Sequence, residues 1–591
     1  MTTPRVSPAR LGARLIRAQP GRYSVNALLW TAIWVMPIVP GFIIQAYFDR
    51  IADTGRVGLS VDTLIVLLVA YGLGRLAVMG VGMWNDIHFM FRNGALLRRN
   101  MLARVYDLPG AQALAESPGE ALSRFREDVE ETEESISWTV DLIGLMSFAV
   151  LAFVVLTRVD AVVTALVFAP TIVVVWVSAQ ARHRIRRYRE AAREATGRIT
   201  ESLGETFGSV QAIKVAGAEE SMIRHMRQLN DRRRSAMVRD KVLTTSLESV
   251  FWNTVSIGTG IVLIVAAGEM RTGEFTVGDF ALFVYFLTFV SEAVFVLGLF
   301  IARYQQARVA FGRMLAVMQT DDHAALVAQH DLHLTGELPA PDVVPAHYAP
   351  LTRLELRGLT YRYPGSDNGV EGVSFTMERG MFTVVTGRIG AGKTTLLRTV
   401  LGLVPASSGQ VLWNGDVVDD PASFFVPPRS AYTPQVPRLF SMSLRANLLM
   451  GRRDQDAALS AAMQAAIMEH DLEHMPEGLA TMVGPLGVRL SGGQVQRSAA
   501  ARMFVRTPDL LVFDDVSSAL DVETEKLLWE RLFATRSGVT TLVVSHRRPA
   551  LQRADQIVVM EGGRVAAIGR VDALLEGSDE FRRLWERESL T

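Results

Sequence analysis

Six long apolar runs, all within the first 301 residues, constrain this chain more than any other feature. A bilayer core is about 30 Å thick, and a helix needs about 20 mostly apolar residues to cross it. The first run is too long for a cleavable signal and has no small-residue cleavage site. Because a soluble core rarely needs six such runs, the sequence predicts six membrane spans. They are Val25–Phe48, Val61–Trp84, Val140–Leu156, Ala161–Ser178, Ser249–Gly268 and Val277–Ile301.

The Arg and Lys residues between these runs predict the orientation of the spans. The N-terminal tail carries five Arg, and the loop between the fourth and fifth spans carries fifteen Arg or Lys. The short loops at 49–60, 157–160 and 269–276 carry at most two each. We therefore expect a multi-pass protein of the cell inner (plasma) membrane, with the N-terminus and everything after Ile301 in the cytoplasm.

The two long cytoplasmic loops, 85–137 and 179–245, show helical periodicity, so the spans should continue as helices beyond the membrane. Lys+Arg 61 balances Asp+Glu 61, and therefore no global charge indicates nucleic acid. The chain has no Cys, which excludes disulfides and thiolate metal sites. We predict three regions: a transmembrane domain over 1–318, a linker over 319–350 and an α/β P-loop nucleotide-binding domain over 351–591.

A phosphate-binding motif supports the last of these regions. Phe382–Thr386 has the pattern of a short buried strand, and Gly387-Arg388-Ile389-Gly390-Ala391-Gly392-Lys393-Thr394-Thr395 follows it. This is G-x-x-x-x-G-K-[ST] between a strand and a helix. The glycines let backbone N–H groups cradle phosphate oxygens, and the helix N-terminus adds partial positive charge. Lys393 should reach the β- and γ-phosphates, and Thr394 should ligate Mg²⁺.

A second predicted strand, Leu510–Phe513, ends in Asp514 and Asp515. Acids at the carboxyl end of a buried strand lie where α/β sheets bind their ligands. We expect Asp514 to hold Mg²⁺ directly or through a bridging group.

Between these motifs lies Leu490-Ser491-Gly492-Gly493-Gln494. Here the sequence resembles the ATP-binding cassette (ABC) transporters of the exporter type, whose signature has this pattern. The resemblance covers nearly the whole chain and implies ATP and Mg²⁺ as cofactors. It implies that Tyr363 stacks on adenine, that Gln435 senses Mg²⁺ and that His546 contacts the γ-phosphate. Asp521 matches the loop that crosses the dimer of nucleotide domains.

The resemblance assigns three sets of residues. The predicted nucleotide-binding set is Tyr363, Gly387, Arg388, Gly390, Ala391, Gly392, Lys393, Thr394, Thr395, Ser491, Gly492, Gly493, Gln494 and Asp521. The predicted metal set is Thr394, Gln435 and Asp514, and the predicted catalytic set is Asp515, His546 and Gln435.

One position departs from the family pattern. Family members have Glu after the Walker B Asp as the general base, and this chain has Asp515. A shift of about 1 Å can cost about 100-fold in rate. We therefore expect weak hydrolysis at the site built on Lys393 and Asp515, as in the degenerate subunit of a heterodimeric exporter. The expected partner is a paralogue with Glu at that position.

Other assemblies remain open at this point. A homodimeric exporter, an ATP-gated regulatory or channel-like assembly and an importer on the same fold all fit the sequence. The transported substrate is not determined, and neither are the roles of Arg75 and Glu292 inside the predicted spans. Membrane lipid is an expected partner and nucleic acid is not.

Overall fold

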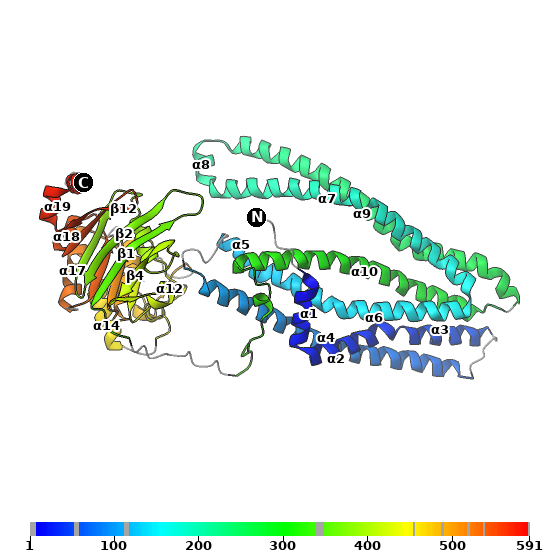
Figure 1. Ribbon diagram of the computed structural model, residues 1–591. Coiled ribbons are helices and arrows are strands. Elements are labelled where there is room, and N and C mark those ends of the chain that lie inside the picture. Colours follow the sequence, from blue (N-terminus) through cyan, green and yellow to red (C-terminus); the bar gives the residue numbers. More distant parts are fainter. Residues whose placement is uncertain are drawn as a thin grey trace. The chain divides into compact units, whose positions relative to one another are not determined.

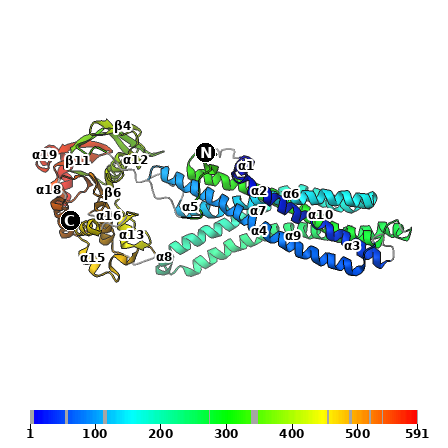
Figure 2. The same ribbon diagram turned by 90° about the horizontal axis from the view of Figure 1, so that it is seen from below.

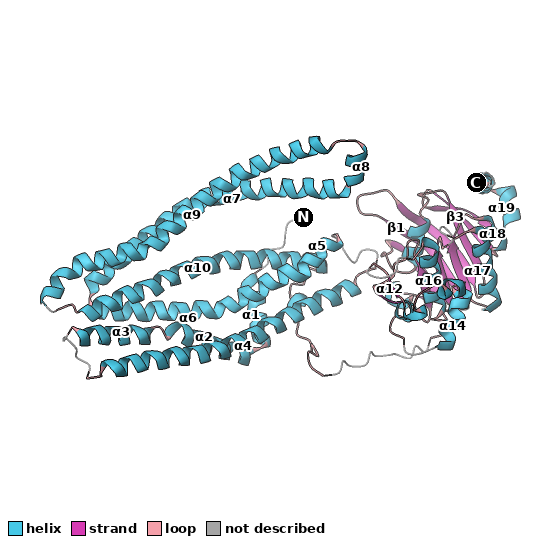
Figure 3. Ribbon diagram, turned by 180° about the vertical axis from the view of Figure 1, so that it is seen from behind, coloured by secondary structure: helices cyan, strands magenta, loops and turns pink. Residues whose placement is uncertain are grey.

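The computed structural model describes residues 7–52, 58–110, 117–272, 274–336, 348–452, 456–485, 490–516, 520–535 and 538–588. The chain divides into two compact units. The first comprises Met1–Leu102 and Glu116–Leu332, and the second comprises Ala103–Ala115 and His333–Thr591. In the described residues, the first unit contains only helices, and all strands belong to the second (Figure 3). The expected combination of a helical membrane domain with an α/β nucleotide domain is confirmed.

Long helices dominate the first unit (Figure 1). Their bounds are α1 Pro8–Ala18, α2 Pro20–Val35, α3 Ile38–Ile51, α4 Val61–Asp107, α5 Pro118–Ser123, α6 Val129–Val159, α7 Ala161–Gly208, α8 Val210–Val215, α9 Glu219–Thr272 and α10 Val277–Met318. A π-helical turn, Arg124–Asp128, joins α5 to α6. The last residues of α4, from Ala103, belong to the second unit.

Each of the six predicted spans lies on these helices, but the first is not continuous. It is divided between α2 and α3 at Met36 and Pro37. Pro37 lacks a backbone N–H donor, so the hydrogen-bond ladder is interrupted there. By length and composition, four described helical stretches can cross a membrane: Pro20–Ile51, Val61–Asp107, Pro118–Val159 and Val277–Met318. The other two predicted spans lie on α7 and α9, where several side chains fall outside the described set.

The helices of the first unit are joined by apolar and polar contacts. The antiparallel pair α7 and α9 lies side by side in Figures 1 and 3. An apolar cluster that includes Phe148, Val262 and Phe286 joins α6, α9 and α10. Polar bonds join α2, α4 and α6, because Asn26 Nδ2 and Ser137 Oγ both donate to the buried carboxylate of Asp86.

The two charged residues that stand out within the predicted spans lie on different helices. Arg75 is half-buried on α4 and Glu292 is half-buried on α10. No ion pair joins either of them to another described residue.

The second unit is built on two principal sheets. A four-stranded antiparallel sheet has the order β2-β1-β4-β5, and a six-stranded sheet has the order β12-β11-β3-β10-β9-β6. The six-stranded sheet is parallel except for β12. The strands are β1 Arg353–Arg362, β2 Gly369–Glu378, β3 Phe382–Gly387, β4 Ser408–Trp413, β5 Asp416–Val417, β6 Ser430–Thr433, β7 Met442–Ser443, β8 Met482–Val483, β9 Leu510–Asp514, β10 Thr540–Val544, β11 Gln556–Glu561 and β12 Arg564–Gly569.

The central strands of the six-stranded sheet are buried, and ten further helices lie among the described residues of this unit. They are α11 Lys393–Val400, α12 Pro421–Phe424, α13 Leu444–Leu449, α14 Asp456–Ala465, α15 Glu469–Glu473, α16 Gly492–Phe504, α17 Val522–Thr535, α18 Arg548–Arg553, α19 Val571–Gly577 and α20 Asp579–Glu588. Figure 2 shows α13 beside α16. Leu511 and Phe513 of β9 face one apolar cluster, whereas Leu510 and Val512 face the other.

A parallel strand buried on both faces reads as a continuous apolar run, which explains the two strand predictions. All residues of β3 and β9 are buried, so the strands expected at 382–386 and 510–513 are confirmed. In a parallel sheet the carboxyl ends of neighbouring strands lie at one edge. The loop after β3 and the two acids at the end of β9 therefore lie close together.

Candidate nucleotide-binding site

The phosphate loop is a backbone cradle between β3 and α11. Gly390 and Gly392 have φ angles of 84° and 93°, which L side chains rarely adopt. A Cβ at Gly392 would also lie 2.8 Å from the Gly369 carbonyl oxygen. Gly392 is the N-cap of α11, so the first N–H groups of that helix point out of its start. Such a helix start attracts anions.

Lys393 bonds back to the backbone of the loop. Its Nζ donates to the Gly387 carbonyl at 2.7 Å and to the Arg388 carbonyl at 2.9 Å. Burial lowers the pKa of Lys393, and the nearby carboxylates of Asp515 and Asp514 partly offset that effect. The ammonium group thus occupies a protected position beside two acids, where a phosphate oxygen could replace the two carbonyls.

Thr394 and Asp514 lie against each other at the position expected for a metal. The Thr394 hydroxyl donates to Asp514 Oδ1 at 3.0 Å, and Tyr432 Oη lies 3.5 Å from Asp514 Oδ2. Burial raises the pKa of Asp514, and the Thr394 hydrogen bond counteracts it. These hard oxygen donors fit Mg²⁺, which usually binds one or two carboxylates together with substrate phosphates. No described group of three or more His, Asp or Glu forms a self-sufficient metal cage.

A pocket of about 490 Å³ gathers most of the predicted residues of this half of the site. It is lined by Tyr363, Asn368, Gly369, Ile389, Gly390, Gly392, Lys393, Thr394, Thr395, Gln435, Asp514, Asp515, Val544 and His546. At one end, the Tyr363 hydroxyl lies 3.4 Å from the Thr395 hydroxyl. Gly387 and Ala391 support the loop beside the pocket: Gly387 accepts from Lys393, and Ala391 is buried.

Asp515 occupies a constrained position in this pocket. Its φ angle is 54°, in the left-handed region that non-glycine residues rarely enter. Its N–H donates to the Val544 carbonyl at 3.1 Å, which attaches the turn after β9 to the end of β10. Gln435 Nε2 lies 3.5 Å from Asp515 Oδ2. The backbone thus fixes where the short carboxylate can reach.

The side chain of Arg388 does not line this pocket. It pairs instead with Glu580 on α20, with Arg388 Nε 2.6 Å from Glu580 Oε1 and Nη2 2.9 Å from Oε2. Arg388 therefore offers the pocket its backbone, whereas its guanidinium is held by the last helix of the chain.

The signature segment forms the start of α16. The Ser491 hydroxyl accepts from the Gln494 N–H, and the Ser491 N–H donates to Gln494 Oε1 at 2.8 Å. This reciprocal capping box places Gly492 and Gly493 in the first turn, with their N–H groups at the helix start. Asp471 then anchors the segment, because it accepts from Gln494 Nε2 and from the Arg497 guanidinium.

The signature segment and the phosphate pocket do not meet within the chain. None of Ser491, Gly492, Gly493 and Gln494 is among the described residues that line the pocket. The side chain of Ile389, in the phosphate loop, is fully exposed, although it is large and apolar. One side of the pocket is thus open to solvent and borders an apolar residue.

Asp521 acts locally in this structure. Its carboxylate accepts from the Thr524 N–H at 2.8 Å and the Thr524 hydroxyl at 2.7 Å, near the start of α17. The Thr524 backbone bond lowers the pKa of Asp521. Ser518 and Ala519 of the same predicted loop lie outside the described residues.

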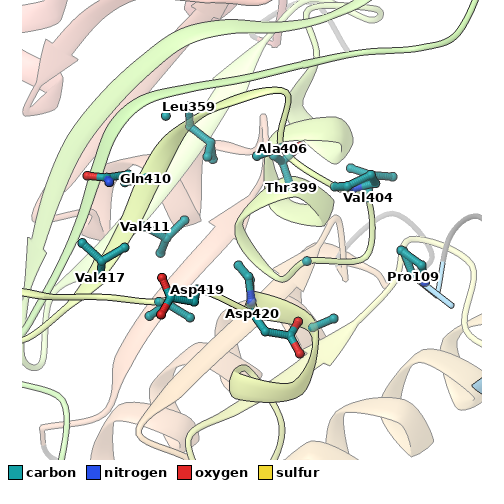
Figure 4. Close-up of a pocket in the computed structure, with 16 residues that line it drawn as sticks. Pro109, Leu359, Thr399, Val404, Ala406, Gln410, Val411, Val417, Asp419 and Asp420 are labelled. Atoms are coloured by element: carbon teal, nitrogen blue, oxygen red, sulfur yellow. The ribbon is translucent and has the colours of Figure 1, made fainter. Parts of the chain in front are cut away.

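A second cavity, of about 420 Å³, lies beside β4 and α12 (Figure 4). Leu359 and Val411 supply apolar walls, and Asp419 and Asp420 supply negative charge. None of the predicted nucleotide residues lines it. Its acids would repel phosphate, so this cavity is not a candidate nucleotide site.

Sequence reasoning missed four residues that shape the site. Asn368 and Gly369 line the pocket, Asp471 holds the signature, and Glu580 holds Arg388. All four lie outside the motifs, and the last two are 23 and 192 positions from their partners Gln494 and Arg388. No local sequence pattern marks them.

Comparisons with known proteins agree with this geometry. The family model described as ABC transporter matches residues 370–518, and that described as ABC transporter transmembrane region matches residues 27–294. The chain therefore belongs to the ABC transporters. Because one membrane domain is fused to one nucleotide domain, it is an ABC exporter half-transporter and a multi-pass membrane protein.

Individual relatives match over most of the chain. An ATP-dependent lipid A-core flippase of Xanthomonas campestris pv. campestris (strain 8004) is 28% identical over 594 residues, covering 97% of this chain and 95% of the flippase. A probable multidrug resistance ABC transporter ATP-binding/permease protein, YheI of Bacillus subtilis (strain 168), is 28% identical over 405 residues, covering 68% and 66%. A bacterial Atm1-family ABC exporter solved with ATP bound shares the fold, with a TM-score of 0.76, 21% identity, and coverage of 96% and 98%.

Proposed function

We propose that this chain is one subunit of a heterodimeric ATP-driven exporter and contributes its weakly hydrolysing nucleotide site. The observation that carries the proposal is Asp515, which lines the pocket where the family has Glu. The proposal has three parts: ATP lies between two chains, the two nucleotide sites of the dimer differ, and closure of the dimer moves the membrane helices.

The separation of the two half-sites supports a shared nucleotide. The pocket offers the phosphate loop, and the start of α16 offers Ser491, Gly492 and Gly493 elsewhere on the same unit. A helix start is a good anion site, but the described residues of this one do not line the chain's own pocket. A second cassette facing the pocket would supply the missing donors and cover Ile389.

Each pocket residue then has its own role in binding ATP. Tyr363 stacks against the base, the N–H groups of the loop from Gly387 to Thr395 bind phosphate oxygens, and Lys393 neutralises charge. Thr394, Asp514 and Gln435 would hold Mg²⁺, which would neutralise the developing charge on the phosphates. His546, an exposed residue that follows β10 and lines the pocket, would contact the terminal phosphate.

The hydrolysis step depends on a base that orients water. Asp515 can accept a proton, but its carboxylate is one methylene closer to the backbone than that of Glu. Its left-handed φ and its N–H bond to Val544 fix the backbone, so the chain cannot easily move to compensate. If the attacking water lies about 1 Å away from its position in line with the breaking bond, the rate of hydrolysis falls by about 100-fold.

The signature supports a division of labour between two unlike subunits. Ser491 and Gln494 form a complete capping box, and Asp471 anchors it. A chain with a weak base and a well-formed signature can complete its partner's site while it hydrolyses slowly at its own. Binding energy at both sites still favours the closed dimer, and this difference in affinity between closed and open dimers drives the conformational change.

The heterodimer is tested by the ATPase rate of the purified full-length chain. We expect slow hydrolysis by the chain alone and an increase of about 100-fold with a partner that carries Glu at the equivalent position. Asp515→Glu should raise the rate of the lone chain, and Asp515→Asn should lower it further. Brisk hydrolysis by the lone chain, abolished by Asp515→Asn, would instead establish a homodimer with a sufficient Asp base.

We also propose that the N-terminus and the nucleotide domain lie in the cytoplasm of a bacterial-type inner membrane, with domain bounds of 1–318, 319–350 and 351–591. The difference in Arg and Lys between long and short loops supports this orientation. Because the chain has no Cys, single cysteines can report orientation without background labelling. In intact cells, a membrane-impermeant maleimide should label Ser60→Cys and leave Ser209→Cys unlabelled.

A further inference from the structure

The last described helix of the chain, α20, makes side-chain contacts with Arg388 of the phosphate loop and with Arg548, two residues after His546. It packs against β3 and β11, and Phe581 at its first turn is fully buried. One of these strands, β3, leads directly into the phosphate loop. The helix is thus attached to the part of the sheet from which the loop emerges.

The first contact is the pair of Arg388 and Glu580. The two groups approach at 2.6 Å and 2.9 Å through two guanidinium nitrogens and both carboxylate oxygens. The Glu580 side chain is 6% exposed, whereas that of Arg388 is 49% exposed. A carboxylate so buried requires compensation, because an unpaired charge away from water is costly. One hydrogen bond, from Nη2 to Oε2, and the close ion-pair contact of Nε with Oε1 also fix the direction of the Arg388 side chain.

The second contact lies on the γ-phosphate side of the pocket. The Arg548 guanidinium lies 4.8 Å from the centre of the Trp585 ring, and its Nη2 donates to the Trp585 carbonyl at 3.0 Å. Arg548 begins α18, two residues after His546. One helix therefore holds both the loop that binds phosphates and the segment that follows His546.

Arg388 is held at both of its ends. Its carbonyl accepts a hydrogen bond from Lys393 at 2.9 Å, and its guanidinium is bound by Glu580. When a phosphate draws Lys393 away from that carbonyl, the contact with Glu580 remains. The loop would then keep its shape during the exchange of Lys393 between carbonyls and phosphate.

We propose that Glu580 is a positioning residue for nucleotide binding, which holds the phosphate loop in its anion-ready shape through Arg388. This inference rests on the proposed binding of ATP at the same pocket. Glu580 touches no nucleotide, and its effect passes through the backbone of residues 387 to 393. A loop that is already ordered loses less conformational freedom on binding than a loose one.

The effect should equal the entropy of ordering about one loop residue, which corresponds to a weakening of ATP binding of about 5-fold to 30-fold. The test titrates the purified full-length protein with trinitrophenyl-ATP and Mg²⁺ and follows fluorescence. Glu580→Gln and Arg388→Gln should each raise the Kd by that factor. The double variant should raise it no further, because both changes break the same pair.

Two readouts separate positioning from a loss of structure. The charge-reversed pair, Arg388→Glu with Glu580→Arg, should return the Kd for trinitrophenyl-ATP to within about threefold of the starting value. Trinitrophenyl-adenosine lacks phosphates, so its Kd should be unchanged in all of these variants. If Glu580→Gln lowers the melting temperature, Arg388→Gln still tests the pair from its exposed side.

Arg583→Gln is the matched control. Arg583 lies 3.9 Å from Glu580 on the same helix and does not contact the loop. It should bind trinitrophenyl-ATP as the unmodified protein does. An unchanged Kd in both Glu580→Gln and Arg388→Gln would overturn the positioning role while leaving ATP binding intact. Absence of binding by the unmodified protein would overturn the proposed function as well.

Discussion

The phosphate pocket and the signature segment belong to the same unit, yet they are built differently. The pocket draws its residues from several loops at one edge of a parallel sheet, and its polar groups point into a shared cavity. The signature is a helix start whose side chains bond to one another and to Asp471. The pocket is thus a cavity without donors from the signature, and the signature is a set of donors without a cavity of its own.

This difference teaches why one chain does not make a complete site. Hydrogen-bond donors stabilise a phosphate only when they lie at bonding distance from it. The two sets of donors in this chain are held by separate frameworks, and the proposed site therefore places one nucleotide between two chains. A variant in the pocket should therefore change the ATP affinity of the lone chain. A variant in the signature segment should instead change the ATPase rate of the assembled transporter.

The largest effect should come from Lys393→Ala. Loss of the ammonium group removes a charge-assisted contact to the phosphates, and affinity for Mg-ATP should fall by at least about 100-fold. Equilibrium binding of radiolabelled ATP to the purified chain measures it. Lys526→Ala is the control, since Lys526 is exposed on α17 and should bind ATP normally. Equal ATP affinity in Lys393→Ala and Lys526→Ala would show that ATP does not bind in this pocket.

An intermediate effect is expected from Ser491→Ala in the assembled transporter. Removing one donor to the developing charge should lower the ATPase rate by about 10-fold to 100-fold. ATP affinity of the lone chain should not change, because the signature does not line its own pocket. Ser443→Ala removes a similar N-cap from α13 and controls for loss of helix stability. A fall in ATP affinity of the Ser491→Ala chain, measured at concentrations at which it is monomeric, would show that the two halves meet within one chain.

A smaller, local effect should follow Asp471→Asn. This change weakens the charged hydrogen bonds from Arg497 and Gln494, so the amides at the start of α16 should exchange hydrogen about 10-fold faster. Mass spectrometry of the exchanged peptides measures it, with ATP affinity of the pocket as the unaffected reference. Asp456→Asn, which breaks an exposed pair with Arg445, should leave that exchange unchanged.

The sequence predicted the parts of this fold that depend on local pattern. The buried strands β3 and β9 were evident as apolar runs, and the glycines before Lys393 predicted the loop because only they tolerate its φ angles. Four of the six predicted spans coincide with helical stretches that are long and apolar enough to cross a membrane. The break at Pro37 could have been expected from proline chemistry, but the apolar pattern continues across it.

Other features depend on contacts between distant positions. Arg388 was predicted to belong to the nucleotide-binding set, but the pairing of its side chain with Glu580 depends on the packing of α20 on β3. No sequence pattern marks Asp471, because only the fold brings it to the signature helix, where it accepts a hydrogen bond from Gln494. The heterodimer assignment stays a prediction, because a single residue type at 515 carries it.

The most direct test of the shared site places a photo-crosslinking benzoylphenylalanine at position 389, the exposed residue of the phosphate loop. Illumination of the purified transporter with Mg-ATP should join this position to the signature segment of another chain, identified by mass spectrometry of the joined peptides. Without nucleotide the product should be scarce. A crosslink to residues 491–494 of the same chain, or an intermolecular product that forms equally without ATP, would contradict the account.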